Sequence, residues 1–408
     1  MFRGWWMVSV AIVGQCFGLA PLLVYTFGIF AKPLAQEFKT NRGSIALAVS
    51  MLDVVITFAA PGAGRLVDRY GARRVIVSSY FALAAALVGL SLVQPPLSRL
   101  YVLYGFAGLV GIATSPVTFS RVIANWFDRK RGLALGFAST GIGLGAFIMP
   151  SLAQFLIDEG GWRRAYLGLA GMSLVIALPV VWIFLRGTPE EVGLLQDGLK
   201  APSSPVPRTG PPAGMRVSEA MRTLTFWQLS GIFFCVAACG NGTIAHIAPL
   251  LTDRGVSGRW AALAASLFGA ASIVGRVGNG YLVDRYFAPR VAAVIFAGAA
   301  VGVAILWSGL TGGAVFLAAA LLGLAIGAES DVMPFLVSRY FGMRSMAELY
   351  GCIFGSYTLG NATGRYLFGA GFDATGSYGT PLGCAFGVLT LAVIATLALG
   401  KYRILPAS

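Results

Sequence analysis

The sequence GRLVDRYGARR at residues 64–74 is a basic loop between two long apolar segments, and it is the strongest indication of how this chain folds. A second copy, GYLVDRYFAPR, stands at residues 280–290, and five consecutive residues of the two copies match at an offset of 216. Internal repeats of this size indicate structurally related halves. The duplication therefore predicts a chain in which the second half repeats the first.

The segments around both loops are long enough to cross a membrane. The chain has 408 residues, of which 57% are hydrophobic and 11% are charged, whereas soluble domains carry about 25% charged residues. A helix needs about 20 apolar residues to cross roughly 30 Å of hydrocarbon. We expect an all-α membrane protein with twelve transmembrane helices, near residues 5–31, 44–64, 75–94, 98–123, 132–157, 164–185, 225–251, 258–282, 290–310, 313–338, 346–371 and 378–400.

Residues 187–222 differ in composition from everything around them. They are rich in proline, serine, glycine and scattered charges, including Pro202, Pro205, Pro207, Pro211 and Pro212. This composition is typical of a partly disordered linker. We expect the linker to be cytoplasmic and to divide the helices six and six, into an N-terminal half at residues 1–186 and a C-terminal half at residues 223–408.

The net charge of +14 reflects topology rather than binding to nucleic acid. If the N-terminus lies inside, 20 of the 30 Lys and Arg residues fall on the inner side and eight on the outer side, while Arg276 and Arg365 fall within helices. Cytoplasmic loops of membrane proteins carry this excess of positive charge. The distribution predicts that both termini are cytoplasmic and that the protein is a multi-pass protein of the plasma or inner membrane.

The duplicated loop has a mechanical interpretation. Asp68, and Asp284 in the second copy, can bond arginine on the same surface or lie at a helix N-terminus, where the dipole favours a carboxylate. Such contacts, with Arg69, Arg73 and Arg285 nearby, would hold the inner side shut and break when it opens. The alternative is that short inner loops collect arginine anyway and that the Asp–Arg pairs only neutralise it.

The loop resembles the hallmark loop of the major facilitator superfamily, and the likeness covers essentially the whole chain. A narrower resemblance comes from NWFDRKRGLALG at residues 125–136, from Pro116 and Pro334, and from Arg276. Together these features are similar to the monocarboxylate transporter branch, including its bacterial members and the related oxalate/formate antiporters. The resemblance implies the major facilitator fold, with two pseudo-symmetric six-helix halves and a binding site between them near mid-membrane.

Arg276 stands inside an apolar stretch, at residues 261–281, that we expect to be buried in the membrane. Its guanidinium keeps its proton, and a fixed charge at a helix centre costs at least roughly 2.5–3.5 kcal/mol on insertion scales. Such a residue marks the route of an anion, because its planar fork of donors matches a carboxylate. Ser272 lies one turn earlier on the same face. In the resembled branch this arginine binds the substrate carboxylate; the alternative is a structural pair with an acid from another helix.

Three further ionisable residues are candidates for proton coupling. His246 is the only histidine in the chain, and an imidazole titrates near physiological pH. The alternative is a buried, hydrogen-bonded packing histidine. Counting residues places His246 toward the outer end of its helix and Arg276 lower, so direct contact of both with one small ligand needs a tilt or a break of the helix. Glu329 and Asp331 lie in the tenth helix, where carboxylates are costly unless they are paired or protonated. One of them could bond Arg276 without substrate, or take up a proton.

Two sets of residues complete the predicted site. Asp53 and Arg365 are a possible ion pair across the halves that would close the outer side; the alternative is separate pairing within each half. Aromatic and small polar residues could line the cavity, although each of them alone fits packing better than binding: Tyr25, Thr114, Ser115, Phe354, Tyr357 and Asn361. Among these, Tyr357 is the strongest candidate because a phenol can bond a carboxylate.

These features predict a secondary transporter that moves a small, lactate-like or pyruvate-like monocarboxylate with a proton by alternating access. A single central cation suits a monoanion, because the eleventh helix lacks the lysine that oxalate-type antiporters pair with their arginine. The alternative is an organic-anion exchanger of the oxalate/formate type. The sequence shows no P-loop, catalytic triad or zinc motif, so we expect no enzyme activity, cofactor, metal or nucleic-acid partner. The expected partners are the organic anion, a proton and membrane lipid, and the expected state is a monomer.

Overall fold

The computed structural model describes residues 2–199, 213–310 and 312–402. All the prolines named above for the predicted linker lie outside the described residues. In the described part the elements are helices, and an isolated β-bridge joins Gly214 and Gly342. The all-α architecture predicted from the apolar segments is therefore confirmed.

The first half is built from long helices that are broken at defined residues. A π turn at Ala20–Val24 follows the first helix, a 3-10 turn at Ile112–Thr114 precedes Pro116, and Gly161 has a positive φ of 76° inside α7. Only glycine adopts that conformation without strain, so α7 comprises two successive rods. The helices are α1 Gly4–Cys16, α2 Phe27–Glu37, α3 Arg42–Tyr70, α4 Ala72–Ser91, α5 Leu97–Gly111, α6 Pro116–Trp126, α7 Arg131–Met172 and α8 Leu178–Phe184.

The second half repeats this arrangement after short helical turns at Pro189–Val192 and Gln196–Gly198. Its first long helix is interrupted at His246, where α10 ends and α11 begins. The helices are α9 Val217–Ala220, α10 Leu224–Ala245, α11 Ile247–Asp253, α12 Gly258–Arg285, α13 Ala288–Trp307, α14 Gly313–Phe341, α15 Met346–Thr375 and α16 Gly379–Leu397.

Nine helical stretches of the described residues are long and apolar enough to cross a membrane. One of them, Arg131–Phe184, has 54 residues and contains the break at Gly161. The helices α12 and α15 have 28 and 30 residues and are not among the nine. The total of twelve crossings stays a prediction.

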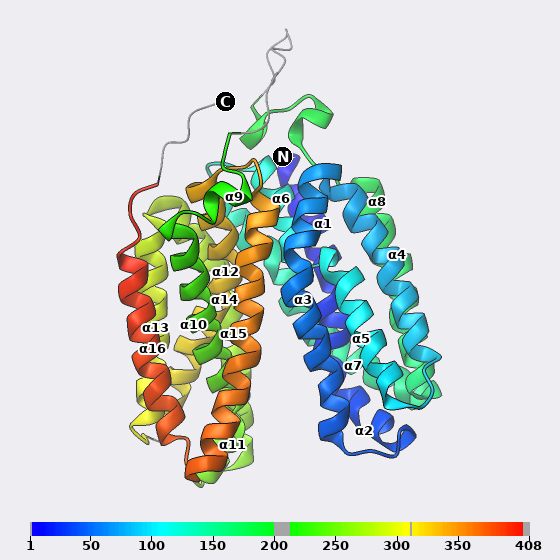
Figure 1. The fold of residues 1–408 in the computed structure, drawn as a ribbon, viewed down its shortest axis with the longest axis vertical. Helices are drawn as coiled ribbons and strands as arrows, with labels where there is room; N and C mark the ends of the chain where they lie inside the picture. Colours follow the sequence, from blue (N-terminus) through cyan, green and yellow to red (C-terminus); the bar gives the residue numbers. More distant parts are fainter. Residues whose placement is uncertain (1, 200–212, 311, 403–408) are drawn as a thin grey trace.

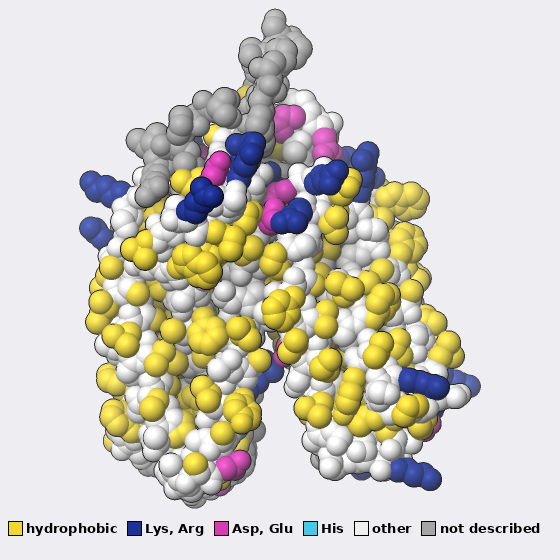
Figure 2. Space-filling view, in the orientation of Figure 1, with side chains coloured by type: hydrophobic (Ala, Val, Ile, Leu, Met, Phe, Trp, Pro, Cys, Tyr) yellow, Lys and Arg dark blue, Asp and Glu magenta, His cyan; other side chains and the backbone are white. Residues whose placement is uncertain are grey.

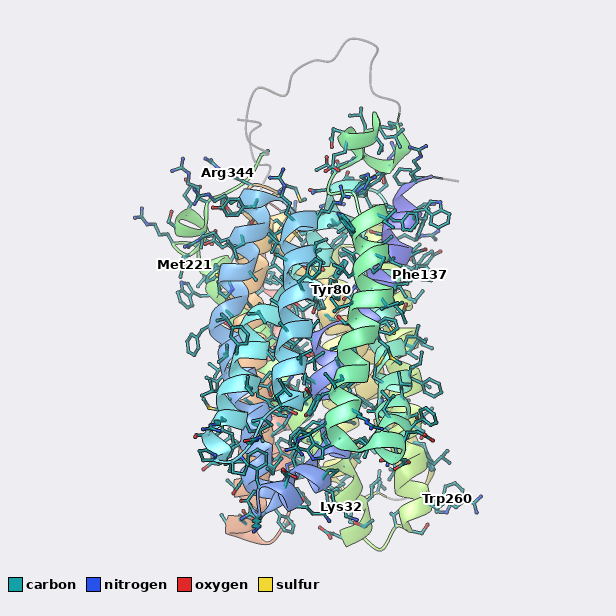
Figure 3. All side chains as sticks on the ribbon, turned by 90° about the vertical axis from the view of Figure 1, so that its right-hand side faces the viewer. Lys32, Tyr80, Phe137, Met221, Trp260 and Arg344 are labelled. Carbon is teal, nitrogen blue, oxygen red and sulfur yellow. The ribbon has the colours of Figure 1, made fainter. Side chains whose placement is uncertain are left out.

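The helices form two bundles that lie side by side (Figure 1). Helices α1–α8 make one bundle and α10–α16 the other. The bundles meet at the end where α1 begins and α16 ends (Figure 1), and they separate toward the opposite end, where the space-filling view shows a wedge-shaped hollow (Figure 2). We call these the closed end and the open end. Arg344 and Met221 lie at the closed end, and Lys32 and Trp260 lie at the open end (Figure 3).

Two seams hold the bundles together, and in both of them the helices touch at glycines, which have no side chain. In the seam between α3 and α15, a Cβ on Gly64 would lie 2.1 Å from the carbonyl oxygen of Ala347, and a Cβ on Gly351 would lie 2.3 Å from that of Ala60. Real Cβ atoms do not approach oxygen so closely. Glycine therefore allows the two helix backbones to pack directly against each other.

The seam between α7 and α12 has the same construction. A Cβ on Gly136 would lie 2.4 Å from the carbonyl oxygen of Arg276, and a Cβ on Gly280 would lie 2.4 Å from that of Gly132. This seam fixes the position of Arg276 along the line from the closed end to the open end, since the backbone of α12 touches α7 at that residue.

Candidate functional site

Arg276 is nine-tenths buried in α12 and faces α14. Its Nη1 donates a hydrogen bond of 2.6 Å to the Ser330 hydroxyl, and that hydroxyl donates in turn to Oδ1 of Asp331 at 3.4 Å. Its buried Nε has no hydrogen-bond partner among the residues that the structure describes. A buried donor of this kind is costly unless something pairs with it.

Both acids of the tenth predicted helix lie beside this arginine. Glu329 is 0% exposed and Asp331 is 1% exposed, and Arg276 is close enough to act electrostatically on both. Within the described ranges, neither oxygen of Glu329 has a hydrogen-bond partner, nor has Oδ2 of Asp331. The structure thus places one fixed positive charge against two buried carboxyl groups.

An aromatic wall from α15 completes this cluster. Phe354 stacks on Tyr357 with ring centroids 5.7 Å apart, and it meets Tyr350 edge to face at 5.9 Å. Tyr357 approaches Glu329. From the other bundle, Tyr25 is 41% exposed and lies within the electrostatic reach of Arg276. The predicted residues Tyr25, Phe354 and Tyr357 are therefore gathered around Arg276, although their contact with substrate stays a prediction.

The remaining predicted lining residues have other local contacts. Thr114 accepts a hydrogen bond from the Leu19 amide at 2.9 Å and donates one to the Gly111 carbonyl at 2.7 Å. Ser115 accepts one from the Val117 amide at 3.3 Å and so caps the start of α6. These hydroxyls satisfy backbone groups at the break between α5 and α6. Their role in binding stays a prediction.

Ser272 and Asn361 are more open to a ligand. Ser272 is half-buried one turn before Arg276, where its backbone packs against Gly327 of α14. The side-chain oxygen of Asn361 is buried and lacks a hydrogen-bond partner in the described part of the chain. The role of both residues in binding stays a prediction.

His246 lies apart from this cluster. Its Nδ1 is 3.3 Å from the Tyr378 hydroxyl, and its Nε2 is 3.2 Å from the carbonyl oxygen of Arg365. Its ring stacks on Phe368 with centroids 6.1 Å apart. These contacts, at the junction of α10 and α11, agree with a position toward the outer end of its helix. Its role with substrate or proton stays a prediction.

The expected pair between Asp53 and Arg365 forms across the two bundles. Nη1 of Arg365 lies 3.8 Å from Oδ2 of Asp53, and their side chains are 43% and 19% exposed. One turn further toward the closed end, the hydroxyls of Thr57 and Thr358 lie 2.9 Å apart. The pair thus forms while the open end is hollow, so a closing role for it stays a prediction.

The two aspartates of the duplicated loop cap helices of the opposite bundle. Asp68 accepts hydrogen bonds from the amides of Ala347 and Glu348 at 3.4 and 3.0 Å, at the start of α15. Asp284 accepts them from the amides of Gly132 and Leu133 at 2.7 and 2.9 Å, at the start of α7. A carboxylate is favoured there by the unpaired amides and by the helix dipole. Both copies of the loop therefore bridge the bundles in the same way.

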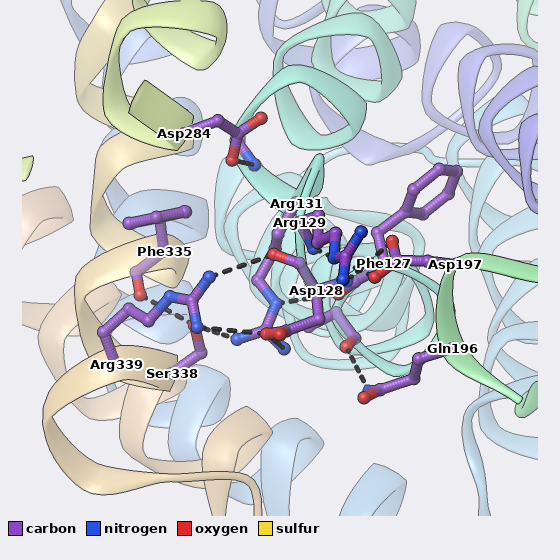
Figure 4. A network of polar contacts seen from close by, with 12 residues as sticks. Phe127, Asp128, Arg129, Arg131, Gln196, Asp197, Asp284, Phe335, Ser338 and Arg339 are labelled. Carbon is purple, nitrogen blue, oxygen red and sulfur yellow. Dashed lines mark hydrogen bonds and ion pairs between the residues drawn. The ribbon is translucent and has the colours of Figure 1, made fainter. Parts of the chain in front are cut away.

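Other charges at the closed end extend this bridge, and the sequence analysis did not single them out. Nη1 of Arg339 lies 3.0 Å from Oδ1 of Asp128, and Nη1 of Arg131 donates to the Ser338 hydroxyl at 3.0 Å (Figure 4). Arg121 lies 3.4 Å from Asp68 and also bonds the Met343 carbonyl. The contacts of Arg339 with Asp128, of Arg131 with Ser338 and of Arg121 with Met343 join one bundle to the other, whereas Arg121 and Asp68 belong to the same bundle.

The arginines predicted beside the loop aspartates make contacts within their own bundle. Arg69 and Arg285 lie over the rings of Tyr70 and Tyr281, at 5.2 and 4.1 Å from the ring centroids. Nε of Arg73 donates to the Trp182 carbonyl at 3.0 Å. Their gating role stays a prediction. The arginines that bridge the bundles at this end include Arg121, Arg131 and Arg339, and also Arg65, whose Nη2 lies 2.6 Å from Oε1 of Glu348.

Two polar residues near Arg276 were also absent from the sequence analysis. Ser330, between the two acids, carries the link from Arg276 to Asp331. Asn279 lies one turn after Arg276, is 3% exposed, and has no partner for either amide atom among the described residues. A search for polar residues at one-turn spacing around Arg276 would have found Asn279.

The chain was compared with known proteins at the level of family, sequence and structure. Residues 13–365 match the family described as Major Facilitator Superfamily. The mouse protein "Monocarboxylate transporter 11" is 26% identical over 388 residues, which cover 92% of this chain and 83% of that protein. Such relatives are transporters rather than enzymes.

Two solved structures share the fold. The Escherichia coli fucose:proton symporter FucP has a TM-score of 0.69 at 15% identity, with 96% of this chain and 98% of that chain covered. The human organic anion transporter MFSD10 has a TM-score of 0.70 at 14% identity, with 96% and 99% covered. The chain belongs to the Major Facilitator Superfamily, and monocarboxylate transporters are among its relatives.

Proposed function

We propose that this protein is a secondary transporter that moves a small monocarboxylate, such as lactate or pyruvate, together with a proton by alternating access. The observation that carries the proposal is Arg276. Its guanidinium is buried between the bundles near their line of contact, and its Nε lacks a partner among the described residues. A carboxylate would satisfy that donor and pair with the charge.

The surroundings of Arg276 favour a monoanion. In the described chain, Arg276 is the one cation that acts on the carboxyl groups of Glu329 and Asp331. A dianion would bring more negative charge than this site can balance, because unpaired buried charges are strongly disfavoured. The aromatic wall of Phe354 and Tyr357 would pack against the short carbon chain of the substrate.

The shape of the molecule supports alternating access. The predicted topology puts both termini in the cytoplasm, so the hollow end would face outward and the closed end inward. The contacts of Asp68 and Asp284 with opposite helix starts would then be the inner gate, and they would break as the bundles rock. We place the protein, as a monomer, in the plasma or inner membrane.

Uptake into proteoliposomes tests this function. We expect labelled lactate to accumulate when an inward proton gradient is imposed, and Arg276→Gln to abolish uptake. Arg99→Gln, which removes an exposed arginine away from the site, is the matched control and should transport normally. Wild-type uptake by Arg276→Gln would remove the arginine from the site. Uptake that requires a carboxylate inside the liposomes and ignores the proton gradient would instead establish an exchanger.

A further inference from the structure

We propose that Asp331 carries the coupled proton and that Glu329 stays protonated throughout the transport cycle. This inference rests on the proposed function and assigns the chemistry of the same site. It follows from three observations: the number of buried charges, the hydrogen bonds that each carboxyl group makes, and the oxygen that is left free to take a proton.

The first observation is the charge balance around Arg276. One permanent cation lies beside two carboxyl groups that are 0% and 1% exposed. If both carboxyl groups were ionised, the cluster would hold one uncompensated negative charge away from water. Such a charge costs several kcal/mol and is removed by protonation instead. The cluster is neutral when one carboxyl group is ionised and the other holds a proton.

The groups that face the two acids from the neighbouring helices do not change this balance. Tyr350 and Tyr357 approach from α15, Cys239 approaches from α10, and the Ser139 hydroxyl approaches from α7. Phenols, thiols and hydroxyls are neutral at physiological pH in such surroundings. Tyr25 of the other bundle is in turn a neighbour of Tyr357. Arg276 therefore remains the cation that the two acids share.

The hydrogen bonds distinguish the two carboxyl groups. Asp331 is joined to the guanidinium through Ser330, which accepts from Arg276 at 2.6 Å and donates to Oδ1 of Asp331 at 3.4 Å. Because Ser330 accepts from Arg276 and donates to Asp331, Asp331 must be the acceptor, and a carboxylate is the best acceptor. Glu329 has no such link to the guanidinium: neither of its oxygens has a hydrogen-bond partner in the described chain, and the group that approaches it is the neutral phenol of Tyr357. An anion there would be unsupported, so Glu329 is the neutral acid.

Substrate binding then requires a proton. A monocarboxylate on the guanidinium brings a second negative charge, which the cluster cannot hold beside ionised Asp331. A proton from water on the open side forms an O–H bond at Oδ2 of Asp331, the oxygen without a partner among the described atoms. When the substrate leaves on the other side, the guanidinium of Arg276 loses its counter-charge. Asp331 then releases its proton to water and balances Arg276 as before. The net charge carried across the membrane is zero.

The position of Asp331 also explains how the proton could act on the bundles. Its carboxyl group lies between Ser330 of its own bundle and Ser139 of α7 in the other. Protonation turns this carboxyl group from one that only accepts hydrogen bonds into one that can also donate to a neighbouring hydroxyl. The contact between bundles at the level of Arg276 therefore changes with the charge of Asp331.

Proton uptake by the purified protein tests the assignment. The protein in detergent and weak buffer is mixed with lactate, and the released or consumed protons are read with a pH indicator. We expect about one proton taken up per bound lactate by the wild type and by Glu329→Gln, and none by Asp331→Asn. The proposal is overturned if the wild type takes up none, if Glu329→Gln loses the uptake, or if Asp331→Asn keeps it.

Transport assays separate this inference from the proposed function. In proteoliposomes, Asp331→Asn should reduce proton-driven accumulation of lactate by a factor at least ten times larger than the factor by which it reduces lactate counterflow. The variant Asp331→Glu should restore accumulation. A membrane potential set with potassium and valinomycin should leave wild-type uptake unchanged. If the wild type binds and moves no monocarboxylate, the proposed function fails. If it moves lactate but uptake follows the membrane potential, only the electroneutral proton assignment fails.

Discussion

The guanidinium of Arg276 offers more than a positive charge. Its fork can make two parallel hydrogen bonds to a carboxylate, while the ammonium of lysine cannot match that geometry. We expect Arg276→Lys to keep binding but to weaken it about 10–100-fold, since a hydrogen bond to a charged group contributes roughly 1.5–3 kcal/mol. The apparent affinity for lactate in counterflow measures this. Equal affinity in the wild type and Arg276→Lys would show that charge alone holds the substrate.

The contacts of His246 suggest a test that separates it from Asp331. Its ring nitrogens face Tyr378 and the backbone of Arg365, and Gln can replace one donor and one acceptor without titrating. We expect His246→Gln to keep about one proton per bound lactate, measured with the pH indicator. Loss of proton uptake in His246→Gln, with binding retained, would return the coupled proton to the histidine.

Residue types alone predicted part of this site. The cost of a buried guanidinium pointed to Arg276, and two acids in a membrane helix pointed to Glu329 and Asp331. The bond from Arg276 to Ser330 could not be predicted, because it depends on how α12 and α14 rotate against each other. That rotation is set by close backbone contacts, such as Gly327 on Ser272, which only the packed structure reveals.

At the level of helices, the seam between α7 and α12 depends on Gly136. A Cβ there would lie 2.4 Å from the Arg276 carbonyl oxygen, whereas a Cβ on Gly143 of the same helix would meet Ile273 at 3.7 Å, an ordinary contact. Overpacking of this kind costs about 1–3 kcal/mol. We expect Gly136→Ala to lower lactate uptake about tenfold or more and Gly143→Ala to leave it near wild type. Equal uptake by the two variants would contradict a tight seam.

The pair between α3 and α15 gives a second test at this level. Asp53 and Arg365 lie 3.8 Å apart and are partly exposed, so either single reversal places like charges together. We expect Asp53→Arg and Arg365→Asp each to reduce lactate uptake severalfold and the double reversal to restore at least half of it. Partly exposed pairs contribute only about 1 kcal/mol. A double variant no better than the singles would show that the two charges act separately.

The bundles as a whole follow from the duplicated sequence, but their arrangement does not. The repeat at residues 64–74 and 280–290 predicted two halves, and each copy caps a helix of the opposite bundle through Asp68 or Asp284. Arg121, Arg131 and Arg339 instead resembled ordinary inner-side charges, because the sequence does not show which helix starts face which loops. The hollow at one end was likewise not predictable, since a sequence encodes every state of the cycle and the structure shows one.

If the bundles must separate at the closed end during transport, a link across that end should stop it. Arg121 of α6 bonds the Met343 carbonyl of the other bundle, so these two positions lie close together. The double variant Arg121→Cys and Met343→Cys, made in a background without native cysteines, can be bridged by a short, reducible, bifunctional thiol reagent. We expect bridging to lower lactate uptake at least tenfold and reductant to restore it. The matched control bridges Glu37→Cys to Arg163→Cys, whose native side chains lie 2.7 Å apart within one bundle. That bridge should leave uptake unaffected, and undiminished uptake with the closed end bridged would mean that the bundles do not part there.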